Sequence, residues 1–231
     1  MVQVNNEKLF IRVKFKKLGN LQYISHLDLV RTMHKVIVRA NLSLWYTEGF
    51  NPKPKMIFAA PLSIGTESVC EFMDVRLSEP MEPDEVMKRL NENMTEEMQV
   101  IEAYYPETKF TDLKWLSYSM IINTNGANEA LAQRCNEALA SEKLEVLKNT
   151  KSGEAIVDIR PLVKSAECTF DGESLRVACV LSADPSSFLN PEYVVKILRE
   201  KCGILSDENL LNESYSIMRE CAYNVEMKEF K

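Results

Sequence analysis

Residues 9–17 read LFIRVKFKK, and this alternation of apolar and polar side chains decides how the first half of the chain folds. Successive side chains of an extended chain point to opposite faces, so the alternation predicts a half-buried strand. One face would carry Leu9, Ile11, Val13 and Phe15, and the other Phe10, Arg12, Lys14 and Lys16. Gly19-Asn20 should then turn the chain, because both residue types tolerate turn conformations.

A helix with a defined start follows this strand. Ser25 and Asp28, three residues apart, match the capping-box pattern that satisfies free backbone N–H groups at a helix start. At 100° per residue the apolar side chains gather on one face, namely Leu29, Val30, Met33, Val36, Ile37 and Ala40. Arg31, Lys35 and Arg39 recur every four positions on the other side. We therefore expect the helix to pack one face on a sheet and to present a basic stripe outward.

The remaining elements of the first half complete a βαββαβ order. Residues 41–55 look irregular, with room for one short strand at 43–46. Strands are predicted at 56–60, 69–77 and 98–104. A helix should run from Pro83, a favoured early helical position, to about Asn93. This order matches a ferredoxin-like unit.

The second half repeats the order with an extra hairpin. Strands are predicted at 114–123, 144–150, 155–159, 167–170, 175–181 and 214–225, and helices at 128–140 and 191–201. Asp171-Gly172 is a hairpin turn signal, and Gly203 should end the second helix. We therefore predict an α+β protein of two tandem ferredoxin-like domains with antiparallel sheets. The domains would span residues 1–108 and 112–231, with a boundary near Pro106–Asp112.

The charge of the chain is unevenly distributed along its 231 residues. The net charge is −6, but residues 1–60 hold ten Lys or Arg against three Asp or Glu, a net of +7. The remaining residues therefore carry −13. Such asymmetry favours an anionic partner for the N-terminal part. One solvated basic face explains the charge equally well.

Several features point to a cytoplasmic protein with reduced thiols. No segment approaches the ~20 apolar residues that span a bilayer, and the N-terminal run MVQVNNEKLF lacks the plan of a signal peptide. The six cysteines form no CxxC or CxxxCxxC pattern and are scattered along the chain. Scattered cysteines in such a chain are usually reduced core residues rather than metal or cluster ligands.

The least ordinary stretch is Gly49-Phe50-Asn51-Pro52-Lys53-Pro54-Lys55. The two prolines fix their own φ angles and push the residues before them toward extended conformations, so the loop should be stiff. Its lysines can contact phosphate charge, and its phenylalanine can stack on a base. We interpret it as an anion- or nucleotide-binding loop. A structural loop that crosses a sheet edge is the alternative.

The run from Tyr23 to Asp28 leads into the basic helix and contains His26. Free backbone N–H groups at a helix start can bind an anion, and the positive end of the helix favours a neutral imidazole. His26 should lie toward the apolar side, where it could act as a base, a ligand or a hydrogen-bond donor. A structural histidine packed under the loop is an equally good interpretation. We expect His34 to be an ordinary surface residue.

No catalytic constellation is visible in the sequence. The two histidines both lie on one predicted helix, which excludes a histidine-rich metal site. No Walker loop or GxGxxG is present, and all seven glycines are isolated. Cys70 lies in a strand pattern and is best explained as a packed thiol. We expect a non-catalytic protein that binds no metal or cofactor itself, with His26 as the remaining catalytic candidate.

Residues 23–68 closely resemble the radical SAM-linked family, a bacterial family described as a domain of unknown function (number 2344). The matching residues are Gly19, Tyr23-Ile24-Ser25-His26-Leu27-Asp28, Arg39-Ala40, Leu42, Gly49-Phe50-Asn51-Pro52, Pro54-Lys55, Pro61-Leu62 and Gly65, followed by Glu71 and Asp74. In length and element order the resemblance covers essentially the whole chain. Lys53 departs from the family pattern, which often has histidine there, so a charge-based role at this position is retained and a catalytic or metal role is put in doubt.

The resemblance implies an accessory, non-catalytic partner of a separate radical SAM enzyme. S-adenosylmethionine and an iron–sulfur cluster would then reside on that enzyme, and this chain would bind or present an anionic substrate such as RNA or a component of translation. The candidate binding residues are Tyr23, Ser25, His26, Asp28, Arg31, Lys35, Arg39, Gly49, Phe50, Asn51, Pro52, Lys53, Pro54 and Lys55.

Two alternative functions remain at this point. The first is a stand-alone RNA-binding protein that uses the same basic residues. The second is a metal-independent ribonuclease resembling the CRISPR RNA-processing nucleases, which also pair two such domains, with His26 as general base. The second half lacks the glycine-rich loop that those nucleases have near their C-terminus.

Overall fold

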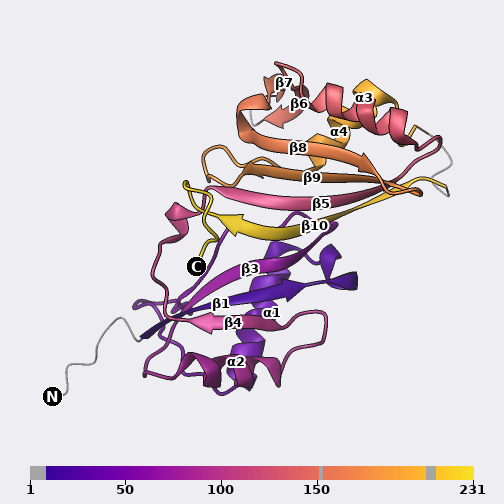
Figure 1. Cartoon of the computed structure of the whole chain (residues 1–231). Coiled ribbons are helices and arrows are strands. Elements are labelled where there is room, and N and C mark those ends of the chain that lie inside the picture. Colours follow the sequence, from indigo (N-terminus) through magenta and orange to yellow (C-terminus); the bar gives the residue numbers. More distant parts are fainter. Residues whose placement is uncertain (1–8, 151–152, 207–211) are drawn as a thin grey trace. The chain divides into compact units, whose positions relative to one another are not determined.

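The computed structural model describes residues 9–150, 153–206 and 212–231. The chain divides into two compact units, residues 1–112 together with Lys231, and residues 113–230. Each unit combines helices with an antiparallel sheet, so the protein is a mixed α+β protein (Figure 1).

The first unit contains the elements predicted for the first half of the chain. They are β1 (Phe10–Lys17), α1 (His26–Arg39), β2 (Met56–Phe58), β3 (Thr66–Arg76), α2 (Pro83–Asn91) and β4 (Val100–Tyr104). The strands lie in the order β4-β1-β3-β2, and each neighbouring pair is antiparallel. The predicted βαββαβ order of this half is confirmed. Strands β2 and β4 are shorter than predicted.

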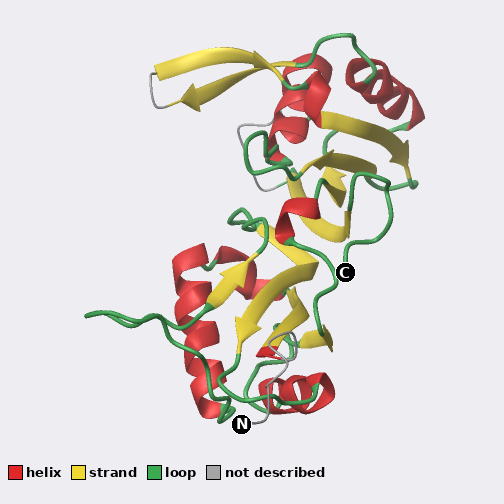
Figure 2. Ribbon diagram, turned by 90° about the vertical axis from the view of Figure 1, so that its left-hand side faces the viewer, coloured by secondary structure: helices red, strands yellow, loops and turns green. Residues whose placement is uncertain are grey.

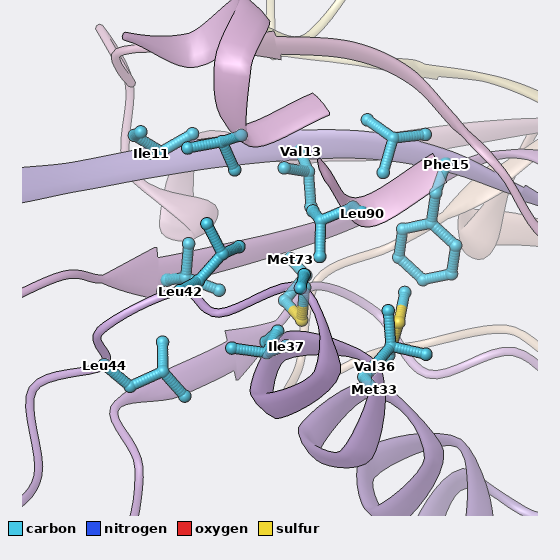
Figure 3. Packing of buried hydrophobic residues seen from close by; sticks show 14 of the residues in the cluster. Ile11, Val13, Phe15, Met33, Val36, Ile37, Leu42, Leu44, Met73 and Leu90 are labelled. Atoms are coloured by element: carbon cyan, nitrogen blue, oxygen red, sulfur yellow. The ribbon is translucent and has the colours of Figure 1, made fainter. Parts of the chain in front are cut away.

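Both helices of this unit pack on the apolar side of β1. Ile11, Val13 and Phe15 are fully buried there. The surrounding core includes Met33, Val36 and Ile37 from α1, Met73 from β3 and Leu90 from α2 (Figure 3). Burying each such side chain contributes roughly 1.5–3 kcal/mol. The predicted apolar faces of β1 and α1 are confirmed, and they form the main hydrophobic contact of the unit.

The opposite side of β1 is less exposed than its charges suggest. The side chain of Arg12 is 1% exposed and donates to both carboxylate oxygens of Asp74, at 2.7 and 2.8 Å. Thr108 accepts a third bond at 2.9 Å, and the ring of Phe110 lies 4.3 Å from the guanidinium carbon. Lys17 is also buried. The half-buried strand is confirmed, but its polar face is closed at Arg12, because a distant carboxylate and ring cover that side chain.

The second unit has a four-stranded sheet and a separate hairpin. Its elements are β5 (Trp115–Asn123), α3 (Glu129–Leu139), β6 (Glu145–Thr150), β7 (Gly153–Asp158), β8 (Val163–Phe170), β9 (Leu175–Ser182), α4 (Glu192–Cys202) and β10 (Ser214–Tyr223). Within this unit the sheet order is β10-β5-β9-β8, with antiparallel neighbours. Strands β6 and β7 pair with each other and form the ribbon that projects from the unit in Figure 2. Strands were predicted at 144–150 and 155–159 without a partner, and the structure pairs them with each other, whereas the hairpin predicted around Asp171-Gly172 forms part of the main sheet as β8 and β9.

Turn and cap signals of the second half act as predicted. Asp171 accepts the backbone N–H of Ser174 at 2.8 Å and pairs with Arg176, and these contacts lower the pKa of its carboxyl to about 2. The turn joins β8 to β9. Gly203, with a φ of +68°, ends α4 in the left-handed conformation that glycine adopts without strain.

The cysteines behave as packed thiols. All six are free, and five of them are buried, whereas Cys221 is partly exposed. Burial raises the pKa of the Cys179 thiol to about 12, which disfavours the reactive thiolate. Cys70 is 1% exposed, in agreement with its prediction as a core residue.

Within the described ranges, no helix is long and apolar enough to cross a membrane.

Replacing Asp74 with alanine should lower the free energy of unfolding by about 3 kcal/mol, because the buried guanidinium of Arg12 would lose its counter-ion. Urea unfolding followed by circular dichroism measures the change. Glu85→Ala is the matched control: Glu85 accepts from Nε of Arg89 at 2.6 Å, but this pair lies at the surface. Its loss should cost about 0.5 kcal/mol. Equal effects of the two substitutions would contradict a special contribution from the Arg12 pair.

Candidate nucleic-acid interface

The start of α1 is capped by its own side chains. The hydroxyl of Ser25 accepts the backbone N–H of Asp28 at 3.2 Å and donates to the Asp28 carboxylate at 2.7 Å. Arg31 donates to the same carboxylate at 3.3 Å. These bonds, that of Ser25 above all, lower the pKa of the Asp28 carboxyl. The predicted capping pair is confirmed, and helix capping alone explains why serine and aspartate stand here.

His26 is the first residue of α1 and is exposed. Its ring stands edge-to-face with that of Phe58, with centroids 5.5 Å apart, and Phe58 in turn contacts the buried ring of Phe15. His26 thus lies against an aromatic side chain that packs on the core, toward the apolar side as predicted, but this one ring leaves most of the imidazole exposed. Tyr23, in the short 3-10 helix before α1, is also exposed.

Residues 45–55 form a narrow hairpin between α1 and β2. The backbone N–H of Lys55 donates to the carbonyl of Trp45 at 3.0 Å, and that of Thr47 donates to the carbonyl of Lys53 at 2.9 Å. The Lys53 N–H in turn donates to the Thr47 hydroxyl at 3.0 Å. Instead of the short strand at 43–46, the structure has isolated bridges at Leu44 and Tyr46. The hairpin is therefore held by its own backbone.

The tip of this hairpin is the most exposed part of the predicted site. Every residue from Glu48 to Lys53 is exposed, and Phe50 has a relative exposure of 112%. Gly49 has a φ of +123°, which side-chain-bearing residues rarely adopt. The proline-flanked lysine Lys53 lies on the same tip, and Lys55 is half-buried nearer the foot. An aromatic ring and a cation are thus presented together to solvent.

The hairpin meets the middle of α1 rather than its start. Nε2 of His34 lies 3.1 Å from the hydroxyl of Tyr46, and the two rings are in edge contact. His34 follows Ser25 by nine residues, or about 13 Å along the helix axis. The structure therefore brings the arm of the hairpin that carries Tyr46 beside the body of α1. The capped start with Tyr23, Ser25 and Asp28 does not take part in this contact.

The basic stripe of α1 faces solvent as predicted. Arg31, Lys35 and Arg39 are all exposed. Arg31 forms the surface pair with Asp28. Lys35, Arg39 and the hairpin residue Lys53 take part in no ion pair with the described residues. Three exposed cations without an ion pair to the described residues and one weakly paired cation therefore lie on α1 and the hairpin tip, in addition to the half-buried Lys55.

Sequence patterns missed an arginine at the foot of the hairpin. The guanidinium carbon of Arg76 lies 4.4 Å from the ring centroid of Trp45 and 5.4 Å from that of Phe10. The backbone N–H of Trp45 donates to the Arg76 carbonyl, and the Arg76 N–H donates to the carbonyl of Lys55. The alternation in β1 and in β3 assigns each residue to a face of the sheet. It does not give the register between the two strands, and this register places Arg76 beside Phe10.

Replacing Ser25 with alanine should lower the free energy of unfolding by about 1 kcal/mol, because a backbone N–H at the helix start loses its acceptor. Ser25→Asn should stay close to wild type, since asparagine is an equally good N-cap residue. Thermal unfolding compares the two variants. A stable alanine variant would contradict the assignment of Ser25 to capping.

Comparisons with known proteins identify a fold relative at low sequence identity. A chain in the crystal structure of a Cbf5-Nop10-Gar1 complex matches with a TM-score of 0.50 and 10% identity, over 94% of this chain and 50% of that chain. The present chain thus spans about half the length of that relative. An unknown protein from Galdieria sulphuraria matches with a TM-score of 0.26 and 11% identity, over 91% of this chain and 98% of that one. No curated protein matches.

Family comparison gives the clearest result. The model of a bacterial family described as "Uncharacterized protein conserved in bacteria (DUF2344)" matches residues 11–191. This stretch includes β1, the capped helix α1, the hairpin and the second unit through β9. The match covers more than half of the chain, and the chain therefore belongs to this family.

Proposed function

We propose that the first unit binds RNA through a basic surface made of α1 and the hairpin. This basic surface consists of Arg31, Lys35, Arg39, Phe50, Lys53 and Lys55. The observation that carries the proposal is the fully exposed ring of Phe50 on a backbone-braced hairpin whose tip also carries Lys53, a cation in no ion pair with the described residues. Aromatic rings and lysines in this combination bind single-stranded nucleic acid by stacking and phosphate contact.

The charges of this surface suit a polyanion. Lys35, Arg39 and Lys53 are solvated cations, and binding a phosphate to each would release counterions into solution. The Arg31–Asp28 pair is solvent-exposed, so its opening costs less than about 1 kcal/mol. Arg31 is therefore available to a stronger anion. Arg12 and Lys17, by contrast, are buried and contribute nothing to such a surface.

The ring of Phe50 adds base stacking, a contribution to binding that does not depend on charge. Stacking of one base on an aromatic ring contributes roughly 1–3 kcal/mol and accepts every base. Hydrogen bonds between Thr47 and Lys53 hold the two arms of the hairpin together. The backbone therefore loses little conformational entropy when a ligand binds. We infer a preference for single strands, whose bases are free to stack.

We further propose that both units are ferredoxin-like domains. The sheet order β4-β1-β3-β2 of the first unit and the order β10-β5-β9-β8 of the second place corresponding strands in corresponding positions. This correspondence requires that the β6–β7 ribbon be counted as an insertion. The fold alone gives no function.

The partner enzyme is a separate proposal that rests on the family resemblance of residues 23–68. We propose that this chain accompanies a radical SAM enzyme in the cytoplasm and presents RNA to it. The iron–sulfur cluster and S-adenosylmethionine would belong to that enzyme, in keeping with the lack of a CxxxCxxC motif in this sequence.

The charge reversal Lys35→Glu/Lys53→Glu should weaken binding of a fluorescent single-stranded RNA of about twelve nucleotides by at least tenfold. The salt slope of log Kd should also fall by about 1.4, because single strands contribute about 0.7 per neutralised phosphate. Fluorescence anisotropy between about 50 and 200 mM salt measures both values. Lys88→Glu/Lys109→Glu, two exposed lysines elsewhere in the first unit, is the matched control. Equal losses in the two double variants would contradict a localised site.

Phe50→Ala should weaken the same RNA about tenfold and leave the salt slope unchanged, because stacking involves no counterion release. The melting temperature should not change, since the ring is fully exposed. Ile101→Ala, which removes another exposed apolar side chain of the unit, is the control. Wild-type affinity in the Phe50 variant would remove the hairpin tip from the proposed interface.

Co-expression with a candidate radical SAM enzyme chosen from the gene neighbourhood of this chain tests the partner proposal. Affinity purification of the tagged chain should recover that enzyme, and the Phe50→Ala variant should recover it equally well if enzyme and RNA use different surfaces. If the tagged chain is recovered without the co-expressed enzyme, although that enzyme is expressed and soluble, the partner proposal is wrong.

A further inference from the structure

Arg76 occupies an unusual position at the foot of the hairpin. It is the last residue of β3, and its side chain lies between the rings of Trp45, at 4.4 Å, and Phe10, at 5.4 Å. Two aromatic faces hold a guanidinium flat and restrict its rotamers. Arg76 is thus fixed in place, whereas a typical surface arginine is mobile.

Arg76 forms no ion pair with a carboxylate in the part of the chain that the structure describes. Asp74 is the acidic residue on the same face of β3, but Arg12 takes both of its oxygens. Across the sheet, the Arg76 N–H donates to the carbonyl of Lys55, and Met56 lies opposite Val75, so Lys55 is the direct neighbour of Arg76. Like charges on directly opposite residues destabilise a sheet. Two cations therefore lie together at the foot of the hairpin.

The hydrogen-bonding groups of Arg76 are also unsatisfied within the described part of the chain. Nε is buried and has no acceptor. The two terminal nitrogens are not among the buried unsatisfied atoms, and no described residue accepts from them. Buried polar groups in native proteins are nearly always paired with protein, water or an ion. The outward-facing edge of the guanidinium is therefore free to bind a ligand from solvent.

We propose that Arg76 and Lys55, with Trp45 as the supporting ring, form a phosphate-binding site. A planar guanidinium can donate two parallel bonds to a phosphate, and the adjacent ammonium adds a point charge. The ligand would also remove the repulsion between the two cations. The assignment of the phosphate to RNA rests on the proposed function of the basic surface, whereas the phosphate site itself does not.

Trp45 provides a direct readout of this site. The chain has two tryptophans, so the Trp115→Phe variant leaves Trp45 as the sole indole of the full-length protein. Its fluorescence should change on titration with single-stranded RNA of about twelve nucleotides, and with inorganic pyrophosphate at higher concentration. In this background Arg76→Met should weaken RNA binding by roughly tenfold and lower the salt slope by about 0.7. Arg76→Lys should recover only part of the lost RNA affinity, because lysine lacks the planar pair of donors.

The matched control is Arg89→Met, which removes a surface arginine of the same unit that is paired with Glu85. It should bind RNA and pyrophosphate as the parent does. A purely structural role for Arg76 predicts a lower melting temperature in Arg76→Met with unchanged ligand affinity, and that result would overturn the proposal. If Arg76→Met fails to fold, Arg76→Lys decides the question by its affinity alone.

The possible failures are distinguishable. RNA binding that depends on Lys35, Phe50 and Lys53 but not on Arg76 overturns the phosphate site and leaves the proposed function standing. A Trp45 response to pyrophosphate that requires Arg76, in a protein that does not bind RNA, supports the phosphate site and overturns the proposed function. No response of Trp45 to either ligand overturns the site.

Discussion

The pairing of Arg12 with Asp74 determines which charged side chains on one face of the first unit's sheet have a partner. The bidentate contact buries a guanidinium in the middle of the sheet, where an unpaired charge would cost several kcal/mol. It also occupies both oxygens of Asp74, the acidic residue two positions before Arg76 on the same face of β3. The same interaction thus stabilises the sheet and leaves a cation without a partner at its edge.

The other face of β1 imposes a second constraint. Ile11, Val13 and Phe15 are buried under both helices, which fixes how α1 lies on the sheet. With α1 so placed, its basic stripe must point away from the core. The contact between His34 and Tyr46 then attaches the hairpin to the same helix. Hydrophobic packing therefore positions the cations, although none of them takes part in the core.

Local signals in the sequence predicted the fold well. The alternation of β1, the cap formed by Ser25 and Asp28, and the turn at Asp171 each depend on residues within a few positions of one another. Such features can be read from periodicity and spacing. The element order of the first half, the paired strands β8 and β9 and the left-handed Gly203 followed from them.

Contacts between distant residues could not be predicted in this way. Arg12 is buried by Asp74, 62 residues later, and by a ring at residue 110. The site around Arg76 joins residues from three segments, and its existence depends on strand register. His34 also owes its role to a tyrosine beyond the end of its helix. Of the candidate interface, sequence patterns therefore identified the exposed residues and Lys55, and missed Arg76 and Trp45, which the fold brings next to Lys55.

The two proposed binding groups lie at opposite ends of the hairpin, and the distance between them would restrict the ligand. From Phe50 at the tip to Lys55 at the foot is five residues, or about 16 Å of extended chain. A single phosphate or mononucleotide reaches only one end. A flexible single strand can place a base on the tip and a phosphate at the foot at the same time, and the second contact then forms at high effective concentration. The proposed RNA-binding function, combined with the length of the hairpin, thus predicts a preference for oligomers over mononucleotides.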